Sequence, residues 1–213
     1  VRENPSVPVV AVSIMVRVGS RWERGDNAGI TNLLQQVLVK GTRSRTALQI
    51  AEEAEGIGGG VSASGDIDNS EIRGVALARH WRRLLELLAD VTLNPTLPEG
   101  EIEPERRSVL SALKSRADQP FQRAYDTMMG RVYGPHPYAL PALGRSEVVA
   151  RLDRAALLDH YRAFYRAGRV VVSVIFGSPA ATMGSFDGSQ YLAAAACACA
   201  AVTALMCAGY LSQ

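Results

Sequence analysis

The apolar residues of the first forty positions change from a spacing of two to helical spacing, and this change most restricts how the chain can fold. Residues 7–18 alternate apolar and mixed positions, which predicts a strand with one buried face. Residues 29–42 carry one apolar stripe, which predicts an amphipathic helix. The stripe consists of Ile30, Leu33, Leu34, Val37 and Leu38. Both elements therefore need a common core.

Helices and strands follow one another irregularly after this point. Thr46 and Asp153 are the residue types that cap helix N-termini, and each precedes an amphipathic segment. Alternating segments flank a turn at Asp68-Asn69. The predicted strands are 61–66, 71–77 and 170–176, and the predicted helices are 46–54, 77–93, 101–116, 121–132, 145–152 and 154–165.

Two of these elements are predicted to lie inside the core. The continuous apolar run 170–176 is typical of a buried strand. The helix 121–132 has an apolar stripe that we expect to make core contacts and not a cofactor site. His80 is predicted to be a solvated residue and not a metal ligand, and His136 to lie in a Pro-rich loop between two prolines. The stripe consists of Phe121, Tyr125, Met128, Met129 and Val132.

Three side-chain amides lie close together on the helix of residues 29–42. Asn32 and Gln36 are four residues apart and share a helix face, and Gln35 is beside them. The simplest interpretation is an amphipathic helix with polar residues on its solvent face. The segments on either side of the helix favour a different interpretation. They are Val-Gly-Ser-Arg-Trp-Glu (18–23), Asn-Ala-Gly-Ile (27–30) and Lys-Gly-Thr (40–42).

With these segments, residues 6–177 resemble one N-terminal-type domain of the insulinase/pitrilysin (inverzincin) family of zinc peptidases. That family includes mitochondrial processing peptidase and the core proteins of the cytochrome bc1 complex. Its active members carry His-x-x-Glu-His where this chain has Asn32-Leu-Leu-Gln35-Gln36. The third zinc ligand of the family, a glutamate on a later helix, aligns with Ala112.

The resemblance implies a metal site that has been lost. Zinc is held by imidazole, thiolate or carboxylate, and the amides of Asn32 and Gln36 are poor substitutes. Gln35 cannot replace the glutamate that takes a proton from zinc-bound water, because an amide has no useful basicity. Ala112 offers no ligand at all. We therefore expect no catalytic residue, no bound metal and no cofactor.

The resemblance also implies the fold and the domain organisation. The expected class is α+β, with a mixed, largely antiparallel sheet, helices mainly on one face, and an additional C-terminal apolar helix. The peptidase-like domain would span residues 1–177, a linker 178–190, and an Ala-rich helix 191–213. In the resembled family the strand at 61–66 is the sheet edge that binds peptide by strand addition.

The C-terminal segment sets the prediction about membranes. Residues 192–211 form twenty positions without a charge, nine of which are Ala. Such a helix is as long as a bilayer core is thick, but Ala is only weakly apolar. The segment is therefore a candidate membrane anchor, with a helix packed in a soluble core or against a partner as the alternative. A further alternative is that an unrelated segment begins at residue 183, joined by a fusion or by a shifted reading frame.

Charge and cysteine content exclude two classes of protein. The formal net charge is +2 with mixed signs, so there is no nucleic-acid signature. All three cysteines lie after residue 190, so the domain has no disulfide framework. The expected function is a non-catalytic structural or partner subunit of a membrane-associated hetero-complex, with lipid contact through 192–211. The alternative is a peptide-binding or processing protein that acts with a catalytic partner.

Overall fold

Five strands form one mixed sheet in the part of the chain that the structure, a computed structural model, describes (residues 2–3 and 8–176). Their order is β1-β5-β2-β4-β3. β1 pairs with β5 in parallel, and every other neighbouring pair is antiparallel. The strands are β1 (Arg2–Glu3), β2 (Val9–Val16), β3 (Gly60–Gly65), β4 (Ser70–Leu77) and β5 (Val170–Phe176).

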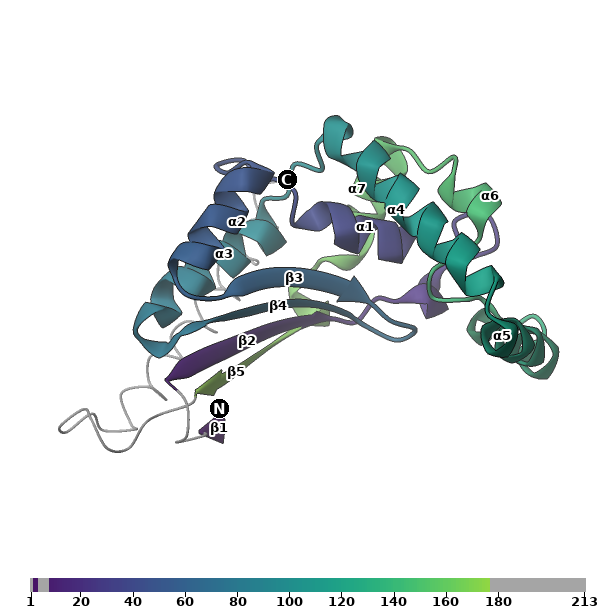
Figure 1. The fold of residues 1–213 in the computed structure, drawn as a ribbon, viewed down its shortest axis with the longest axis horizontal. Coiled ribbons are helices and arrows are strands. Elements are labelled where there is room, and N and C mark those ends of the chain that lie inside the picture. The colour runs from purple at the N-terminus through teal and green to yellow at the C-terminus, as the bar shows by residue number, and fades with distance from the viewer. Residues whose placement is uncertain (1, 4–7, 177–213) are drawn as a thin grey trace.

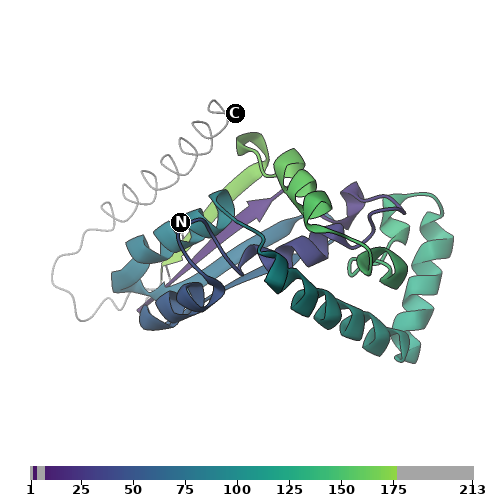
Figure 2. The same cartoon turned by 90° about the horizontal axis from the view of Figure 1, so that it is seen from above.

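The helices cover one face of this sheet, as Figure 1 shows. α4 and α5 extend beyond the end of the sheet and form an angled arm, which is clearest from above (Figure 2). The expected class, an α+β domain with a mixed sheet and helices mainly on one face, is confirmed. The helices are α1 (Ile30–Leu38), α2 (Ala47–Gly56), α3 (Trp81–Leu93), α4 (Glu99–Ala117), α5 (Pro120–Tyr133), α6 (Ser146–Val149) and α7 (Arg154–Phe164).

The core lies between the sheet and α1. In β2 the alternate residues Val10, Val12, Ile14 and Val16 are almost completely buried, as their spacing predicts. Ile14 pairs with Ile72 on one side and with Val172 on the other, so β2 is a central strand. The apolar stripe of α1 is also buried. The two elements that open the chain therefore share one core.

The predicted helix starts are correct at two positions. Thr46 accepts a hydrogen bond from the backbone N–H of Gln49, and the Gln49 side chain accepts one from the backbone N–H of Thr46, which makes a capping box. Asp153 caps α7 by accepting from the N–H of Ala156 at 2.8 Å. Both capping predictions are confirmed.

Other helix boundaries were predicted wrongly. The helix expected from residue 77 begins at Trp81, because Leu77 is the last residue of β4 and pairs with Val9. A short 3-10 turn, Ala78–His80, connects the two elements. The helix expected over 145–152 is shortened to Ser146–Val149.

Two burial predictions were also wrong. Strand β5 is buried on only one face, since Val174 is 3% exposed while Val171 and Ile175 are 58% and 43% exposed. The helices of the described residues lie on the other side of the sheet, so none of them covers the outward positions (Figure 1). The apolar stripe of α5 lies outside the core, with Phe121 at 73% and Val132 at 69% exposure.

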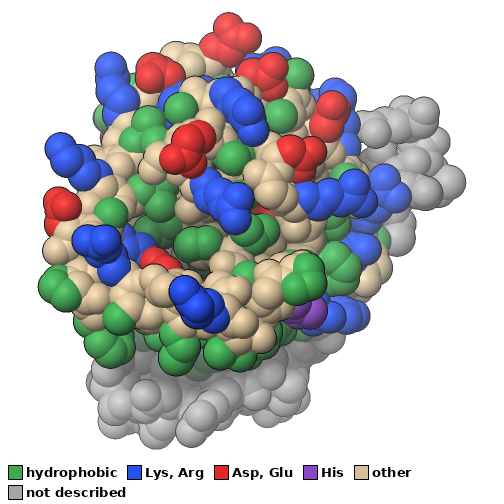
Figure 3. Space-filling model, turned by 90° about the vertical axis from the view of Figure 1, so that its right-hand side faces the viewer, with side chains coloured by type: hydrophobic (Ala, Val, Ile, Leu, Met, Phe, Trp, Pro, Cys, Tyr) green, Lys and Arg blue, Asp and Glu red, His purple; other side chains and the backbone are tan. Residues whose placement is uncertain are grey.

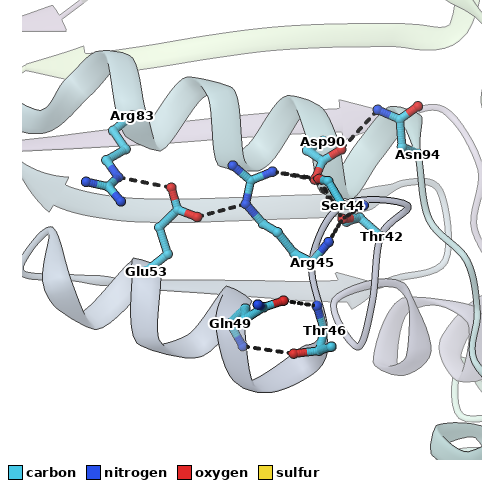
Figure 4. A network of polar contacts seen from close by, with 9 residues as sticks. All are labelled: Thr42, Ser44, Arg45, Thr46, Gln49, Glu53, Arg83, Asp90 and Asn94. Atoms are coloured by element: carbon cyan, nitrogen blue, oxygen red, sulfur yellow. Dashed lines mark hydrogen bonds and ion pairs between the residues drawn. The ribbon is translucent and has the colours of Figure 1, made fainter.

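A network of charged side chains fixes the turn that follows α1 (Figure 4). Arg45 donates to Glu53 of α2 at 2.8 Å and to Asp90 of α3 at 2.6 Å. Thr42 donates to the same Asp90 at 2.7 Å, and Arg83 donates to Glu53 at 3.0 Å. The hydrogen bond from Arg45 is the main cause that lowers the pKa of Glu53. The end of α1 is therefore held to both α2 and α3.

The predicted linker 178–190 and the apolar segment 192–211 lie outside the described residues. Of the helices in residues 8–176, none is both long enough and apolar enough to span a bilayer.

Candidate functional site

A buried carboxylate holds the start of α1. Glu23 accepts hydrogen bonds from the backbone N–H of Gly29 at 2.7 Å and of Thr31 at 2.8 Å. These are donors that the first turn of a helix leaves unpaired. Burial raises the pKa of Glu23, and the backbone hydrogen bonds oppose that rise. Glu23 belongs to the segment 18–23 that precedes the helix, but no spacing pattern in the sequence indicates this role.

The turn into α1 requires a glycine. Gly29 has φ of 100°, which is left-handed backbone that a side chain disfavours. A Cβ atom at this position would lie 2.7 Å from Cγ2 of Val149 and 2.9 Å from the carbonyl oxygen of Leu143. The start of α1 is therefore packed closely against the loop before α6.

The three amides of α1 do not share one solvent-exposed face. Asn32 is 7% exposed, Gln35 is completely buried and Gln36 is partly exposed. The interpretation of these residues as the solvent face of an amphipathic helix is therefore wrong for two of the three. Buried side-chain amides need hydrogen-bond partners.

Gln35 is enclosed between the sheet and α7. Its Nε2 donates a hydrogen bond to the hydroxyl of Tyr165, and burial strongly raises the pKa of that phenol. Oε1 of Gln35 has no hydrogen-bond partner. Turning the amide by 180° would pair Oε1 with the phenol and leave Nε2 unpaired, so one polar atom is unsatisfied in either orientation. An amide in this position can neither take a proton nor reach solvent.

His160 lies on the other side of the start of α1. Its Nε2 is 3.2 Å from Oγ1 of Thr31, and its ring is 4.7 Å from that of Phe164. Burial lowers the pKa of His160 to about 4, so the imidazole is neutral at pH 7. His160 is 129 residues away from Thr31, so no local sequence pattern predicts their contact.

Helix α4 brings Ala112 to the same region. Lys40, just past the end of α1, forms an ion pair with Glu105 of α4 at 2.8 Å, and the two helices contact each other. Figure 1 shows that they run in roughly opposite directions. Ala112 is seven residues, or two turns, beyond Glu105 and so lies on the same face of α4. Ala112 is exposed. Gln36 lies on α1, one helical turn before Lys40.

The donor groups at these four positions do not fit a zinc ion. Protein zinc sites use imidazole, thiolate or carboxylate ligands, whereas Asn32, Gln35, Gln36 and Ala112 supply three amides and a methyl group. Within residues 2–3 and 8–176 no three His, Cys, Asp or Glu side chains are grouped so that they could hold a metal ion.

The edge of the sheet lies next to the amides. β3 is the last strand in the order and pairs only with β4 among the described residues. A Cβ atom at Gly65 would lie 3.3 Å from Cγ2 of Thr31 and 3.5 Å from Cγ of Gln35. The prediction that 61–66 forms a sheet edge is therefore consistent with this geometry, and the edge lies beside Gln35.

The comparisons with known proteins agree with this arrangement. A family model described as "Insulinase (Peptidase family M16)" matches residues 1–145. An uncharacterized zinc protease of Bacillus subtilis is 32% identical over 171 residues, which are 80% of this chain and 42% of the relative. Cytochrome b-c1 complex subunit 1 of Rattus norvegicus is 30% identical over 175 residues, covering 82% of this chain and 36% of the subunit.

A solved structure has a similar fold. The crystal structure of a peptidase M16 inactive domain from Pseudomonas fluorescens superposes with a TM-score of 0.78 at 25% identity. The match covers 93% of this chain and 47% of that chain. This chain thus spans less than half the length of the relatives that it matches.

Proposed function

Because the chain belongs to the insulinase family of peptidases, family M16, we propose that it is a peptidase-like subunit without catalysis of its own, acting as a partner in a larger protein complex. The proposal depends above all on one observation. The positions where the resemblance expects zinc ligands and a general base hold Asn32, Gln35, Gln36 and Ala112.

The burial of Gln35 strengthens this argument. A general base must reach a water molecule held on a metal, and it must be basic near neutral pH. Gln35 is not basic, and it is enclosed by Tyr165 and the end of β3. The proposed subunit would therefore lack both the general base and the access to water that hydrolysis requires.

The relatives support a role as a subunit. One relative is named as a subunit of the cytochrome b-c1 complex, and one similar structure is described as an inactive M16 domain. The α5 stripe and the outward face of β5 leave apolar side chains exposed, as at Phe121 and Val171. Exposed apolar surface of this kind is frequent where another protein binds.

A second function is favoured by the outer edge of β3, which pairs with no other strand of the described residues. An extended peptide could add to this strand through main-chain hydrogen bonds and would then lie against Gln35 and Thr31. The chain would in that case present a peptide to a catalytic partner without cleaving it.

We also propose that residues 192–211 attach the protein to a membrane, because they form twenty positions without a charge. A truncation from Ser185 onward should then give a folded domain that stays in solution without detergent. Aggregation of the truncated protein would count against the anchor, because it would mean that the segment covers an apolar face of the domain.

The experiment that tests the subunit function combines mass and activity. The natively extracted full chain is analysed by size-exclusion chromatography with light scattering and then assayed with quenched fluorescent peptides, with and without a chelator. We expect a mass well above the 22.8 kDa of one chain, a second polypeptide in the peak, and no chelator-sensitive cleavage. A monomer that cleaves peptides until the chelator is added would refute the proposal.

A further inference from the structure

A cavity of about 330 Å³ lies beside the candidate site, between the end of α4, α5 and the loop that leads into α6. Leu113, the residue after Ala112, is part of its wall. The cavity is large enough for an amino-acid side chain. A polypeptide lying along the face of α4 that carries Ala112 would therefore pass its mouth.

The charged groups in the wall have a positive balance. Arg116 donates two hydrogen bonds to the carboxylate of Asp126, at 2.7 and 3.0 Å, so these two charges are paired. The side chains of Arg123, Arg145 and Glu147 also line the cavity, and none has a hydrogen bond or ion pair within the described residues. Among the lining groups without a partner in the described residues, there are thus two guanidinium groups and one carboxylate.

The residues that α5 contributes to the cavity wall show which face of the helix is turned toward the domain. Arg123, Asp126 and Thr127 face the cavity, whereas the residues of the apolar stripe, such as Phe121 and Val132, are on the opposite side by the 100° step of a helix. Figure 3 looks onto this end of the molecule and shows basic and acidic side chains around a hollow. α5 therefore turns its polar face toward the domain, the reverse of an ordinary surface helix.

A second cavity offers no comparable site. It has a volume of about 500 Å³ and is lined by Arg45 and Arg83, among others. Both arginines already form ion pairs with Glu53, and Arg45 forms another with Asp90. A ligand there would have to compete with the contacts that hold α2 and α3 in place.

We propose that the cavity beside Leu113 binds a carboxylate of a polypeptide that lies along α4, and that Arg123 and Arg145 hold this carboxylate. Guanidinium groups form paired hydrogen bonds with carboxylates, and the apolar part of an acidic side chain fits against Leu113. The inference rests on the proposed function and specifies its ligand as acidic. Basic side chains would be repelled by the same two arginines.

The test is an NMR titration of the full chain that follows the arginine Nε–H signals. The probes are N-acetyl-glutamate N-methylamide, its glutamine analogue and N-acetyl-alanine, which carries only a terminal carboxylate. The glutamate probe should bind at least about fivefold more tightly than the glutamine analogue, since charge-assisted hydrogen bonds are the stronger ones. Tighter binding of N-acetyl-alanine than of the glutamate probe would support a carboxylate site and assign it to a chain terminus.

Variants decide whether the binding occurs in this cavity. Arg123→Gln and Arg145→Gln should each weaken the glutamate probe by about threefold or more, and Glu147→Gln should strengthen it, because an opposing charge is removed. Arg107→Gln is the matched control: it removes the same charge from an exposed position of α4 outside the cavity and should change little.

Three results would overturn the inference: equal binding of the glutamate and glutamine probes, no binding of either, or equal effects of Arg107→Gln and Arg123→Gln. None of these results depends on zinc or on peptide cleavage, so the failure of this inference is distinguishable from the failure of the proposed function.

Discussion

Replacing Gln35 with glutamate tests whether this position is enclosed. The change restores the residue type that the resemblance expects for a general base, and it places a carboxylate in a site with no solvent exposure. Full burial raises a carboxyl pKa by about 3 units, and each unit corresponds to about 1.4 kcal/mol, so the charged form costs about 4 kcal/mol at pH 7.5. A hydrogen bond from the Tyr165 hydroxyl would offset about 1.5 kcal/mol of this.

The expected loss of unfolding free energy is therefore about 2.5 kcal/mol at pH 7.5. The loss should be smaller at pH 5. A raised pKa in the folded state means that the folded protein binds the proton more tightly than the unfolded chain, so the stability of the variant falls as the pH rises above the unfolded value. Urea denaturation followed by circular dichroism at both pH values measures the difference.

Gln36→Glu provides the matched control, because it adds the same charge one residue further along α1 at a partly exposed position. We expect it to change the unfolding free energy by less than about 1 kcal/mol, with little dependence on pH. If Gln35→Glu and Gln36→Glu were equally stable at pH 7.5, Gln35 would be in contact with solvent and the description of the site would be incorrect.

Three further predictions concern the surroundings of the site. The imidazole of His160 should stay neutral from pH 5.5 to pH 8 in NMR spectra, because burial lowers its pKa to about 4, and a titration near pH 6.5 would contradict this. Glu23→Ala should lower the unfolding free energy by about 2–3 kcal/mol, because two buried backbone donors lose their acceptor. Glu55→Ala, which removes an exposed carboxylate, should cost less than about 0.5 kcal/mol. Phe121→Ser should change the unfolding free energy by less than about 0.5 kcal/mol and improve solubility, whereas Leu34→Ala should lower the unfolding free energy by about 2–5 kcal/mol. Similar losses for the two variants in denaturation experiments would mean that Phe121 is part of the core.

The spacing of apolar residues predicted those helices and strands that bury a single apolar face. The alternation in β2 and the stripe of α1 were sufficient because each pattern has one apolar face, and both faces meet in the core. The caps at Thr46 and Asp153 were predictable for a similar reason, since capping involves residues only three positions apart.

Local spacing did not predict what covers each face. The sequence of α5 shows an apolar stripe, but the polar residues opposite it face the domain, and this orientation depends on Asp126 pairing with Arg116 of another helix. The run in β5 is mostly apolar on both sides, yet the helices of the described residues cover only one side of the sheet. A continuous apolar strand is thus evidence for a position within a sheet and not for burial on both faces.

The contacts of the candidate site were predictable only in part. The amides and Ala112 could be identified from the segments around α1 and on α4, because the resemblance depends on local motifs. The partners Tyr165 and His160 lie about 130 residues from Gln35 and Thr31, and no pattern within the sequence connects them. The structure was needed to show that Gln35 is enclosed.

We expect the chain to have no zinc site, and zinc titration calorimetry of the purified full chain measures this without depending on peptide cleavage. The control is the variant with Asn32→His, Gln35→Glu, Gln36→His and Ala112→Glu, which supplies the ligand types that zinc requires. We expect no sub-micromolar binding by the unchanged chain and the appearance of a site in the variant. One zinc ion bound per unchanged chain at sub-micromolar concentration would contradict the account.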